Sequence, residues 1–246
     1  MDLTSNGNKA VRVEPMPSPR YAIYYTPPPF SALARFGAGV LGYDCFDATD
    51  VPHSRLDGID PAVLRLMTID SRRYGLHATL VAPFYLDHHS EDDLMAAVET
   101  YAKRTVPLPI GHLAASLMGG FVVIIPAQSH PDIAQFAAEC LEAFHPFQAP
   151  LSAADRERRV KAGLTPRQIE LLDRWGYPYV RNEFRFHMTL AGPLPEEQRT
   201  EISAALSKAF APRAADHFEI DAISLMRQDD SSARFRVLKR CRLRGR

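Results

Sequence analysis

The chain has 246 residues, 46% hydrophobic and 24% charged, values typical of a globular protein with one large domain or two fused lobes. Lysine plus arginine number 29, as do aspartate plus glutamate, so the formal net charge is zero and no overall field favours a long nucleic acid or an acidic membrane. Three cysteines without Cys-x-x-Cys spacing favour neither a disulfide framework nor a zinc site, and they fit a reducing cytoplasm.

The N-terminal region predicts a leader followed by a strand and a helix. Residues 1 to 19 lack the apolar stretch of a signal peptide and are expected to form a flexible leader, which leaves residues 20 to 246 as a single domain. Arg20 to Tyr25 is a β-branched and aromatic run stopped by prolines, which predicts a strand. A short helix is expected near Ser31 to Leu41. No apolar run of the chain reaches the roughly 18 residues needed to span a bilayer.

The next stretch predicts a strand followed by a helix. Leu76 to Leu86 alternates partly and contains β formers, and Pro83 indicates a sheet edge or a bulge. Ser90 to Arg104 has apolar residues at helical spacing and begins with a weakened capping box between Ser90 and Asp93.

The middle of the chain predicts a hairpin followed by helices. Two strand-like runs, Leu108 to Met118 and Phe121 to Ile125, are separated by a Gly-Gly dipeptide that suits a tight turn. His130 to Phe144 is helical by its apolar period, and helical patterns also run from Ser152 to Trp175. Within them, Arg156 to Lys161 (RERRVK) favours a solvated helix face over an RNA-binding patch.

The last third predicts a second clear strand at Phe184 to Leu190 (FRFHMTL). Alternation along a strand puts Arg185, His187 and Thr189 on one face and the apolar residues on the other. The remaining expected elements are a helix and two strands, at Pro195 to Phe210, Phe218 to Arg227 and Arg234 to Lys239.

Each half of the chain therefore offers a His-bearing strand, a following helix and a later hairpin. The two His-bearing strands are about 110 residues apart, the separation of His77 and His187. Antiparallel strands with helices between them favour an α+β fold over a doubly wound parallel sheet. We expect two ferredoxin-like antiparallel lobes.

Two His-x-Thr-Leu tetrapeptides carry the chemistry that the sequence predicts. His77 and Thr79 must share one strand face, and so must His187 and Thr189. Two such strands facing each other across a cleft would place two imidazoles beside one small group, with two hydroxyls able to donate to its oxygens. Phosphodiester hydrolysis needs one base to deprotonate water and one acid to protonate the departing alkoxide. Imidazole suits both roles, because its ordinary pKa of about 6.5 lies near working pH.

The paired motifs resemble the two-histidine (2H) phosphoesterase superfamily. The segments RYAIYYTPPPFSALARFGAGVLGYD, YGLHATLVAPF and FRFHMTLAGPL, in this order, resemble its branch found beside carbon–phosphorus lyase genes for phosphonate use. The resemblance implies a bilobal, LigT-like α+β fold around a central cleft, no metal or other cofactor, and His77, Thr79, His187 and Thr189 as the catalytic positions.

For this branch the implied substrate is a small cyclic phosphodiester, 5-phosphoribosyl 1,2-cyclic phosphate, opened to a ribose bisphosphate. A terminal phosphate on that substrate would need a further cation, and Arg185 and Arg181 before the second motif are candidates. Tyr24 and Tyr74 could line the cleft and pack on a sugar ring, although as core aromatics they need no such role.

Two other functions stay open. One keeps the chemistry but acts on RNA ends that carry a 2′,3′-cyclic phosphate, and the zero net charge counts against a long RNA partner. The other is a non-catalytic module that binds a sugar phosphate or nucleotide in the same cleft. The sequence predicts no membrane partner and leaves the oligomeric state undetermined.

Overall fold

The structure is a computed structural model that describes residues 19 to 245, so the predicted leader lies outside it except for Pro19. The strands are β1 (Arg20–Tyr25), β2 (Tyr43–Asp44), β3 (Thr49–Asp50), β4 (Ala78–Phe84), β5 (Leu108–Gly111), β6 (Leu113–Met118), β7 (Phe121–Pro126), β8 (Met188–Ala191), β9 (Phe218–Ile220), β10 (Ala222–Gln228) and β11 (Arg236–Arg242). The helices are α1 (Ala32–Leu41), α2 (Pro61–Met67), α3 (Ile69–Arg72), α4 (Glu91–Arg104), α5 (Pro131–Phe144), α6 (Ala153–Lys161), α7 (Pro166–Trp175) and α8 (Glu196–Phe210).

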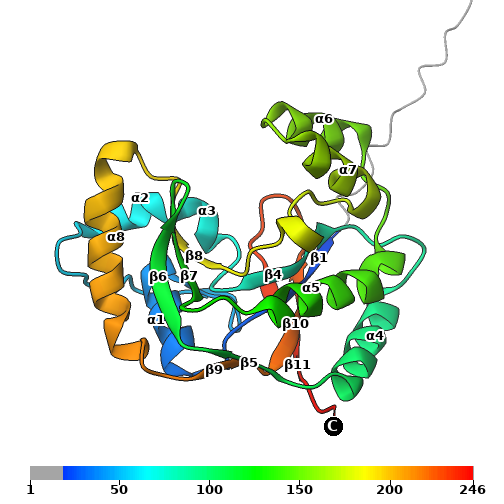
Figure 1. The fold of residues 1–246 in the computed structure, drawn as a ribbon, viewed down its shortest axis with the longest axis horizontal. Helices are drawn as coiled ribbons and strands as arrows, with labels where there is room; N and C mark the ends of the chain where they lie inside the picture. Colours follow the sequence, from blue (N-terminus) through cyan, green and yellow to red (C-terminus); the bar gives the residue numbers. More distant parts are fainter. Residues whose placement is uncertain (1–18, 246) are drawn as a thin grey trace, which may run out of the picture.

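One seven-stranded antiparallel sheet, in the order β11-β10-β1-β4-β8-β7-β6, organises the fold (Figure 1). Strands β4 and β8 are joined through the pair Ala78 and Met188, whereas their outer neighbours pair over several residues. The sheet is therefore two half-sheets, one of four strands and one of three, that meet at the two His-bearing strands. The predicted α+β class with antiparallel sheets is confirmed.

The helices divide between the two half-sheets. Helix α5 packs on β4 and helix α4 packs on β10 and β11, whereas α8 packs on β6 and β7 and α1 packs on β8. Figure 1 shows α8 and α4 at opposite ends of the molecule, with α6 and α7 standing together beyond the end of the sheet. The lobes are thus two half-sheets, each with its own helices.

The lobes do not follow the two halves of the chain, and this corrects the predicted repeat. The hairpin β6–β7, which follows the first His-bearing strand in sequence, pairs with β8, and the hairpin β10–β11 pairs with β1. Periodicity predicts the type of each element, but it does not determine which strand edge a hairpin joins. Each lobe therefore takes a hairpin from the opposite half of the chain.

Three local predictions are confirmed: the capping box that begins α4, the bulge at Pro83 and the Gly-Gly turn. The side chain of Ser90 accepts from the backbone of Asp93 while the Asp93 carboxylate accepts from the backbone of Ser90, which completes the capping box of α4. The pairing of β1 with β4 shifts between Val81 and Phe84, so Pro83 does lie at a bulge. Gly119 and Gly120 form the turn between β6 and β7.

Three predicted strands are shorter or divided. Leu108 to Met118 splits into β5 and β6 at Gly111, which has a φ of 70° and sends β5 to pair with β9 in a separate sheet. Phe218 to Arg227 divides into β9 and β10 at Asp221, whose carboxylate accepts from the Arg240 guanidinium. The segment from Phe184 to His187 lies outside β8, which begins at Met188. In addition, the hairpin β2–β3 and the helices α2 and α3 were not predicted.

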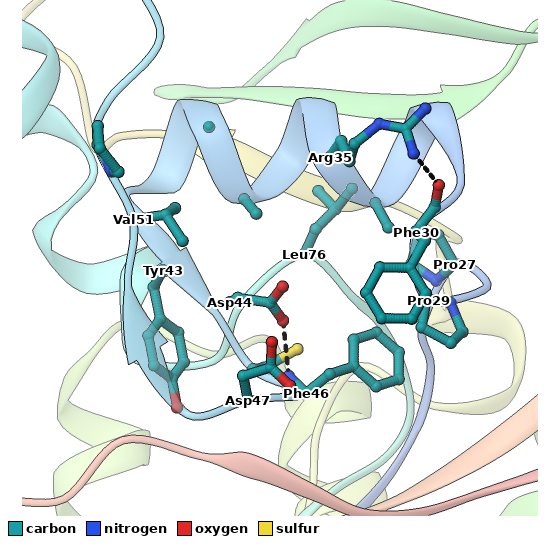
Figure 2. Close-up of a pocket in the computed structure, with 15 residues that line it drawn as sticks. Pro27, Pro29, Phe30, Arg35, Tyr43, Asp44, Phe46, Asp47, Val51 and Leu76 are labelled. Carbon is teal, nitrogen blue, oxygen red and sulfur yellow. Dashed lines mark hydrogen bonds between the residues drawn. The ribbon is translucent and has the colours of Figure 1, made fainter.

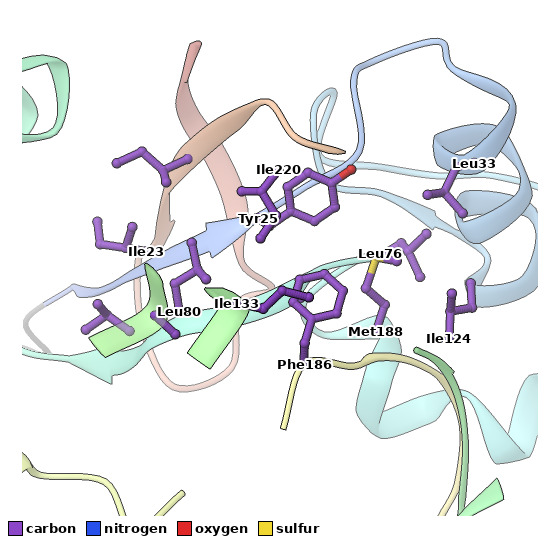
Figure 3. Packing of buried hydrophobic residues seen from close by; sticks show 14 of the residues in the cluster. Ile23, Tyr25, Leu33, Leu76, Leu80, Ile124, Ile133, Phe186, Met188 and Ile220 are labelled. Carbon is purple, nitrogen blue, oxygen red and sulfur yellow. The ribbon is translucent and has the colours of Figure 1, made fainter. Parts of the chain in front are cut away.

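Apolar side chains cover both faces of β1. Ile23 and Tyr25 belong to the main core with Leu80 and Met188 (Figure 3). Tyr24 belongs to a smaller cluster on the other face, against which Tyr74 packs. Because both faces of β1 are buried, this strand is a rigid base for the groups beside it.

All three cysteines are free and buried, and the described helices include none long and apolar enough to cross a membrane.

Candidate active site

Strand pairing brings the two His-x-Thr motifs together. Ala78 lies opposite Met188 in the antiparallel pair β4–β8, so the same register places His77 opposite Thr189 and Thr79 opposite His187. Ala78 and Met188 are fully buried, and their neighbours point to the other face of the sheet. Each histidine therefore lies across from the threonine of the other motif, with a local two-fold arrangement about the Ala78–Met188 pair.

The two imidazoles are held in the same way. The Nδ1 atom of His77 lies 2.9 Å from the Gly75 carbonyl oxygen, and the Nδ1 atom of His187 lies 2.8 Å from the Arg185 carbonyl oxygen. A carbonyl can only accept, so in each ring Nδ1 carries the donated hydrogen. The Nε2 atom of each neutral ring is then the acceptor that is available to a substrate.

Aromatic rings enclose His77. The His77 ring stacks on Tyr24, with centroids 4.1 Å apart, and lies tilted against Tyr74 at 5.4 Å. Burial lowers the pKa of His77 to about 4; the hydrogen bond to the Gly75 carbonyl acts in the opposite direction, and the nearby His187 lowers the pKa further. His77 is therefore neutral at neutral pH and can accept a proton.

A cavity of about 350 Å³ opens at His77, and His187 is not among the residues that line it. His77, Thr79 and Thr189 line it together with Tyr24 and Tyr74. Thr79 on β4 pairs with Tyr24 on β1, so the Thr79 hydroxyl and the Tyr24 phenol lie on the same wall of the cavity. The cavity thus combines a proton acceptor, two hydroxyl donors and aromatic surface, a set that suits a small polar ring bearing a phosphate.

Comparison with known proteins shows the family of this chain. A family described as a protein of unknown function (DUF1045) matches residues 79–236, more than half of the chain. The chain belongs to the DUF1045 family.

Two curated relatives also match this DUF1045 protein, and both are named ribose 1,5-bisphosphate phosphokinase PhnN. The protein of Janthinobacterium sp. (strain Marseille) is 33% identical over 230 residues, which are 92% of this chain and 51% of the relative. The protein of Laribacter hongkongensis (strain HLHK9) is 32% identical over 231 residues, 91% of this chain and 51% of the relative. The chain therefore spans about half the length of the curated relatives it matches.

Solved structures similar to this DUF1045 protein include TT0787 of Thermus thermophilus, with a TM-score of 0.41 and 15% identity over 92% of this chain and 98% of that one. They also include E. coli LigT complexed with 3′-AMP, with a TM-score of 0.36 and 13% identity over 93% of this chain and 99% of that one. The family and the curated relatives agree with the resemblance to two-histidine phosphoesterases of the phosphonate-associated branch.

The two arginines predicted as phosphate contacts lie elsewhere in this DUF1045 protein, and the structure corrects their placement. The Arg181 guanidinium forms an ion pair with Glu142 and lies 4.8 Å over the Trp175 ring. The exposed Arg185 guanidinium donates to the Phe184 carbonyl at 3.1 Å and lines a different cavity, beside α5. Alternation misplaced Arg185 because a 3-10 turn, Arg181–Glu183, ends at Phe184 just before this residue.

Several residues that line the cavity were not predicted from the sequence, among them Arg20, Arg159 and Tyr177. Arg20 is the first residue of β1, and Arg159 lies in the stretch that was interpreted as a solvated helix face. No signal in the sequence separates Arg159 from its neighbours, since helical spacing offers it Asp155 as a partner four residues earlier. The contact depends on where α6 stands in the fold.

A second cavity, of about 300 Å³, differs in chemistry (Figure 2). Phe30, Phe46 and prolines line it together with the carboxylates of Asp44 and Asp47. Its arginine, Arg35, donates to the Phe30 carbonyl oxygen. Two carboxylates would repel a phosphate, whereas the cavity at His77 has one, Asp70, together with Arg20 and Arg159, so the cavity at His77 is the better candidate active site.

Proposed function

We propose that this DUF1045 protein is a metal-independent phosphoric diester hydrolase that opens a small cyclic phosphodiester with His77 and His187 as a proton-transfer pair. The observation that carries the proposal is the pairing of Ala78 with Met188, which brings the strands of the two His-x-Thr motifs side by side in the sheet. Each imidazole is oriented through Nδ1 by a carbonyl two residues earlier, so both Nε2 atoms are free for chemistry.

The environments of the two histidines divide their roles. The lowered pKa of His77 keeps its ring neutral, so His77 takes a proton from water as the water attacks phosphorus. His187 gives a proton to the departing oxygen of the cyclic phosphate as the phosphorus–oxygen bond breaks. Thr79 and Thr189 donate hydrogen bonds to the phosphoryl oxygens, where negative charge grows. Water and the cyclic diester become a phosphomonoester and a hydroxyl group, and the two histidines exchange protonation states.

Within this class we favour 5-phosphoribosyl 1,2-cyclic phosphate as the substrate. Cleavage of its bond between phosphorus and the ribose 2-oxygen gives ribose 1,5-bisphosphate, the compound in the name of both curated relatives. RNA 2′,3′-cyclic phosphate is the alternative substrate, but a zero formal net charge offers no general attraction for a long polyanion. A role in binding alone would leave the two oriented Nε2 atoms without a purpose.

The experiment that tests the proposal compares two substrates and two site variants in buffer containing EDTA. Phosphorus NMR should show opening of 5-phosphoribosyl 1,2-cyclic phosphate, with a 2′,3′-cyclic nucleotide converted much more slowly. His77→Ala and His187→Ala should each lower turnover by roughly 10²- to 10⁴-fold, because each removes one proton transfer. Thermal unfolding of the variants would confirm that both are folded.

His88→Ala is the matched control, because the His88 side chain is 95% exposed and does not line the cavity. Full activity of His77→Ala or His187→Ala would exclude the acid–base pair, and loss of turnover in EDTA restored by a divalent metal would exclude the metal-independent mechanism. Preference for the nucleotide would assign the protein to RNA ends. Binding of both compounds without turnover would assign it a binding role.

A further inference from the structure

A neighbouring cavity of about 340 Å³ lies beside α6 and α7 and shares lining residues with the cavity at His77. Arg20, Arg159 and Tyr177 line both cavities and so form the junction between them. Figure 1 shows α6 and α7 above the end of β1, which is the strand that begins with Arg20. A substrate seated at His77 could therefore extend toward two guanidinium groups.

Arg159 differs from the other cations of α6. Arg156 pairs with Asp173 at 2.6 Å and Arg158 with Asp155 at 2.6 Å, and Lys161 pairs with Glu157 at 2.7 Å. Among the described residues, no carboxylate lies within ion-pair distance of Arg159, and its Nε atom is buried without a hydrogen-bond partner.

The surroundings of Arg159 hold it in place. Its guanidinium lies 5.3 Å from the centroid of the Tyr177 ring, a cation–π contact that fixes the direction of the fork. A guanidinium that is positioned without a carboxylate keeps its charge and its donors for an anion.

Two further donors point to an anion in the same place. The Nε2 atom of Gln148, which lines the neighbouring cavity, is also buried without a partner. Arg20 donates through Nε to the Gln228 side-chain oxygen at 2.8 Å, and because this partner is a neutral amide the charge of Arg20 is not cancelled. Asp155 lines the cavity too, but Arg158 already neutralises it. Buried donors without acceptors are costly, so an oxygen-rich ligand would satisfy them.

We infer that Arg159, Arg20 and Gln148 form a second anion subsite that holds the terminal phosphate of the substrate while its cyclic phosphate lies between His77 and His187. This inference rests on the proposed function and names the feature that selects among cyclic phosphodiesters. Substrates that carry a phosphate at the far end of the sugar are bound by both subsites, and substrates without it are bound only at the histidines.

The test measures kcat/KM for 5-phosphoribosyl 1,2-cyclic phosphate and for ribose 1,2-cyclic phosphate, which lacks the terminal phosphate. Arg159→Gln should lower kcat/KM for the first compound by roughly 10- to 100-fold and leave the second nearly unchanged, since a hydrogen bond to a charged group is lost. Arg159→Lys keeps the positive charge but loses the two parallel donors of the guanidinium. Its kcat/KM for the first compound should lie between those of Arg159→Gln and the unmodified protein.

Arg167→Gln is the control, because Arg167 lies on α7, pairs with Glu170 at 2.8 Å and lines neither cavity. It removes one positive charge from the same pair of helices and should leave both substrates unaffected. An equal loss on both substrates in Arg159→Gln, or no loss on either, would overturn the inference.

Calorimetric titration with ribose 5-phosphate gives a readout that does not depend on turnover. Binding should weaken at least tenfold in Arg159→Gln and should persist in His77→Ala. Arg159-dependent binding in a protein that opens neither cyclic compound would mean that the subsite exists and the proposed hydrolysis does not occur. Turnover combined with unchanged ribose 5-phosphate binding in Arg159→Gln would mean that the hydrolysis occurs and that Arg159 forms no such subsite.

Discussion

At the scale of single residues, identical motifs acquire different properties from their surroundings. His77 and His187 each begin a His-x-Thr motif, and each donates a hydrogen bond from Nδ1 to a backbone carbonyl oxygen. Only His77 is stacked on Tyr24 and flanked by Tyr74, and burial there lowers its pKa to about 4. Burial of the His77 ring therefore favours its neutral form, which is the form that the proposed mechanism requires of a base.

The pKa of His77 predicts the acidic limb of the rate profile. Protonated His77 cannot accept a proton, so kcat/KM should fall as pH decreases through about 4. Tyr74→Ala admits water to the ring and should raise this pKa toward its ordinary value of about 6.5, moving the limb to higher pH. Tyr74→Phe, which keeps the aromatic cover, is the control and should leave the limb in place. A limb that stays near pH 4 in Tyr74→Ala would show that burial by Tyr74 is not the cause.

At the scale of elements, the end of β8 is fixed by a close approach to the β6–β7 turn. Gly192 follows β8 with a φ of 124°, and its N–H donates to the Met67 carbonyl at 2.8 Å. A Cβ at this position would lie 2.7 Å from the Gly120 carbonyl oxygen. The residue after β8 therefore has two reasons to be glycine, its backbone conformation and the lack of space.

Gly192→Ala tests this packing. The substitution should lower the free energy of unfolding by about 1–3 kcal/mol through strain and overlap. Gly58→Ala is the matched control, because Gly58 also has a positive φ, 81°, but nothing lies within 4 Å of the position that its Cβ would occupy. Urea denaturation of both variants would separate the strain of a positive φ from the overlap with Gly120. Equal destabilisation would show that conformation alone matters and that the contact with Gly120 does not.

At the scale of the whole molecule, exchange of elements ties the lobes together. The four-stranded half-sheet contains β1 and β4 from the first half of the chain and β10 and β11 from its end. Helix α1, which directly follows β1, packs on β8 in the other lobe. Neither lobe can be assembled from one continuous half of the chain.

This exchange predicts cooperative unfolding. Fluorescence of Trp175, beside the four-stranded lobe on α7, and far-ultraviolet circular dichroism, which reports on both lobes, should follow one common transition in urea. Two separate midpoints would show that the lobes unfold independently and would contradict a single bilobal domain.

Much of the fold could be predicted because its signals are local. Apolar period and capping residues located α1, α4, α5, α7 and α8, and the Gly-Gly dipeptide located the β6–β7 hairpin. Alternation predicts that His77 shares a face with Thr79 and His187 with Thr189, and each histidine lies one residue before its strand. Arg185 lies in the irregular segment before β8, where alternation does not apply, and it lines a cavity other than the one at His77. Its predicted position was therefore wrong.

The sequence by itself determined the α+β class and the two His-x-Thr motifs, since each depends on residues a few positions apart. Only the tertiary structure decided that β4 and β8 are neighbours, that the hairpins are exchanged between lobes, and that Arg20 and Arg159 line the cavity at His77. These features depend on which strand edges meet and where α6 stands against β1, and such contacts between distant segments leave no periodic trace in the chain.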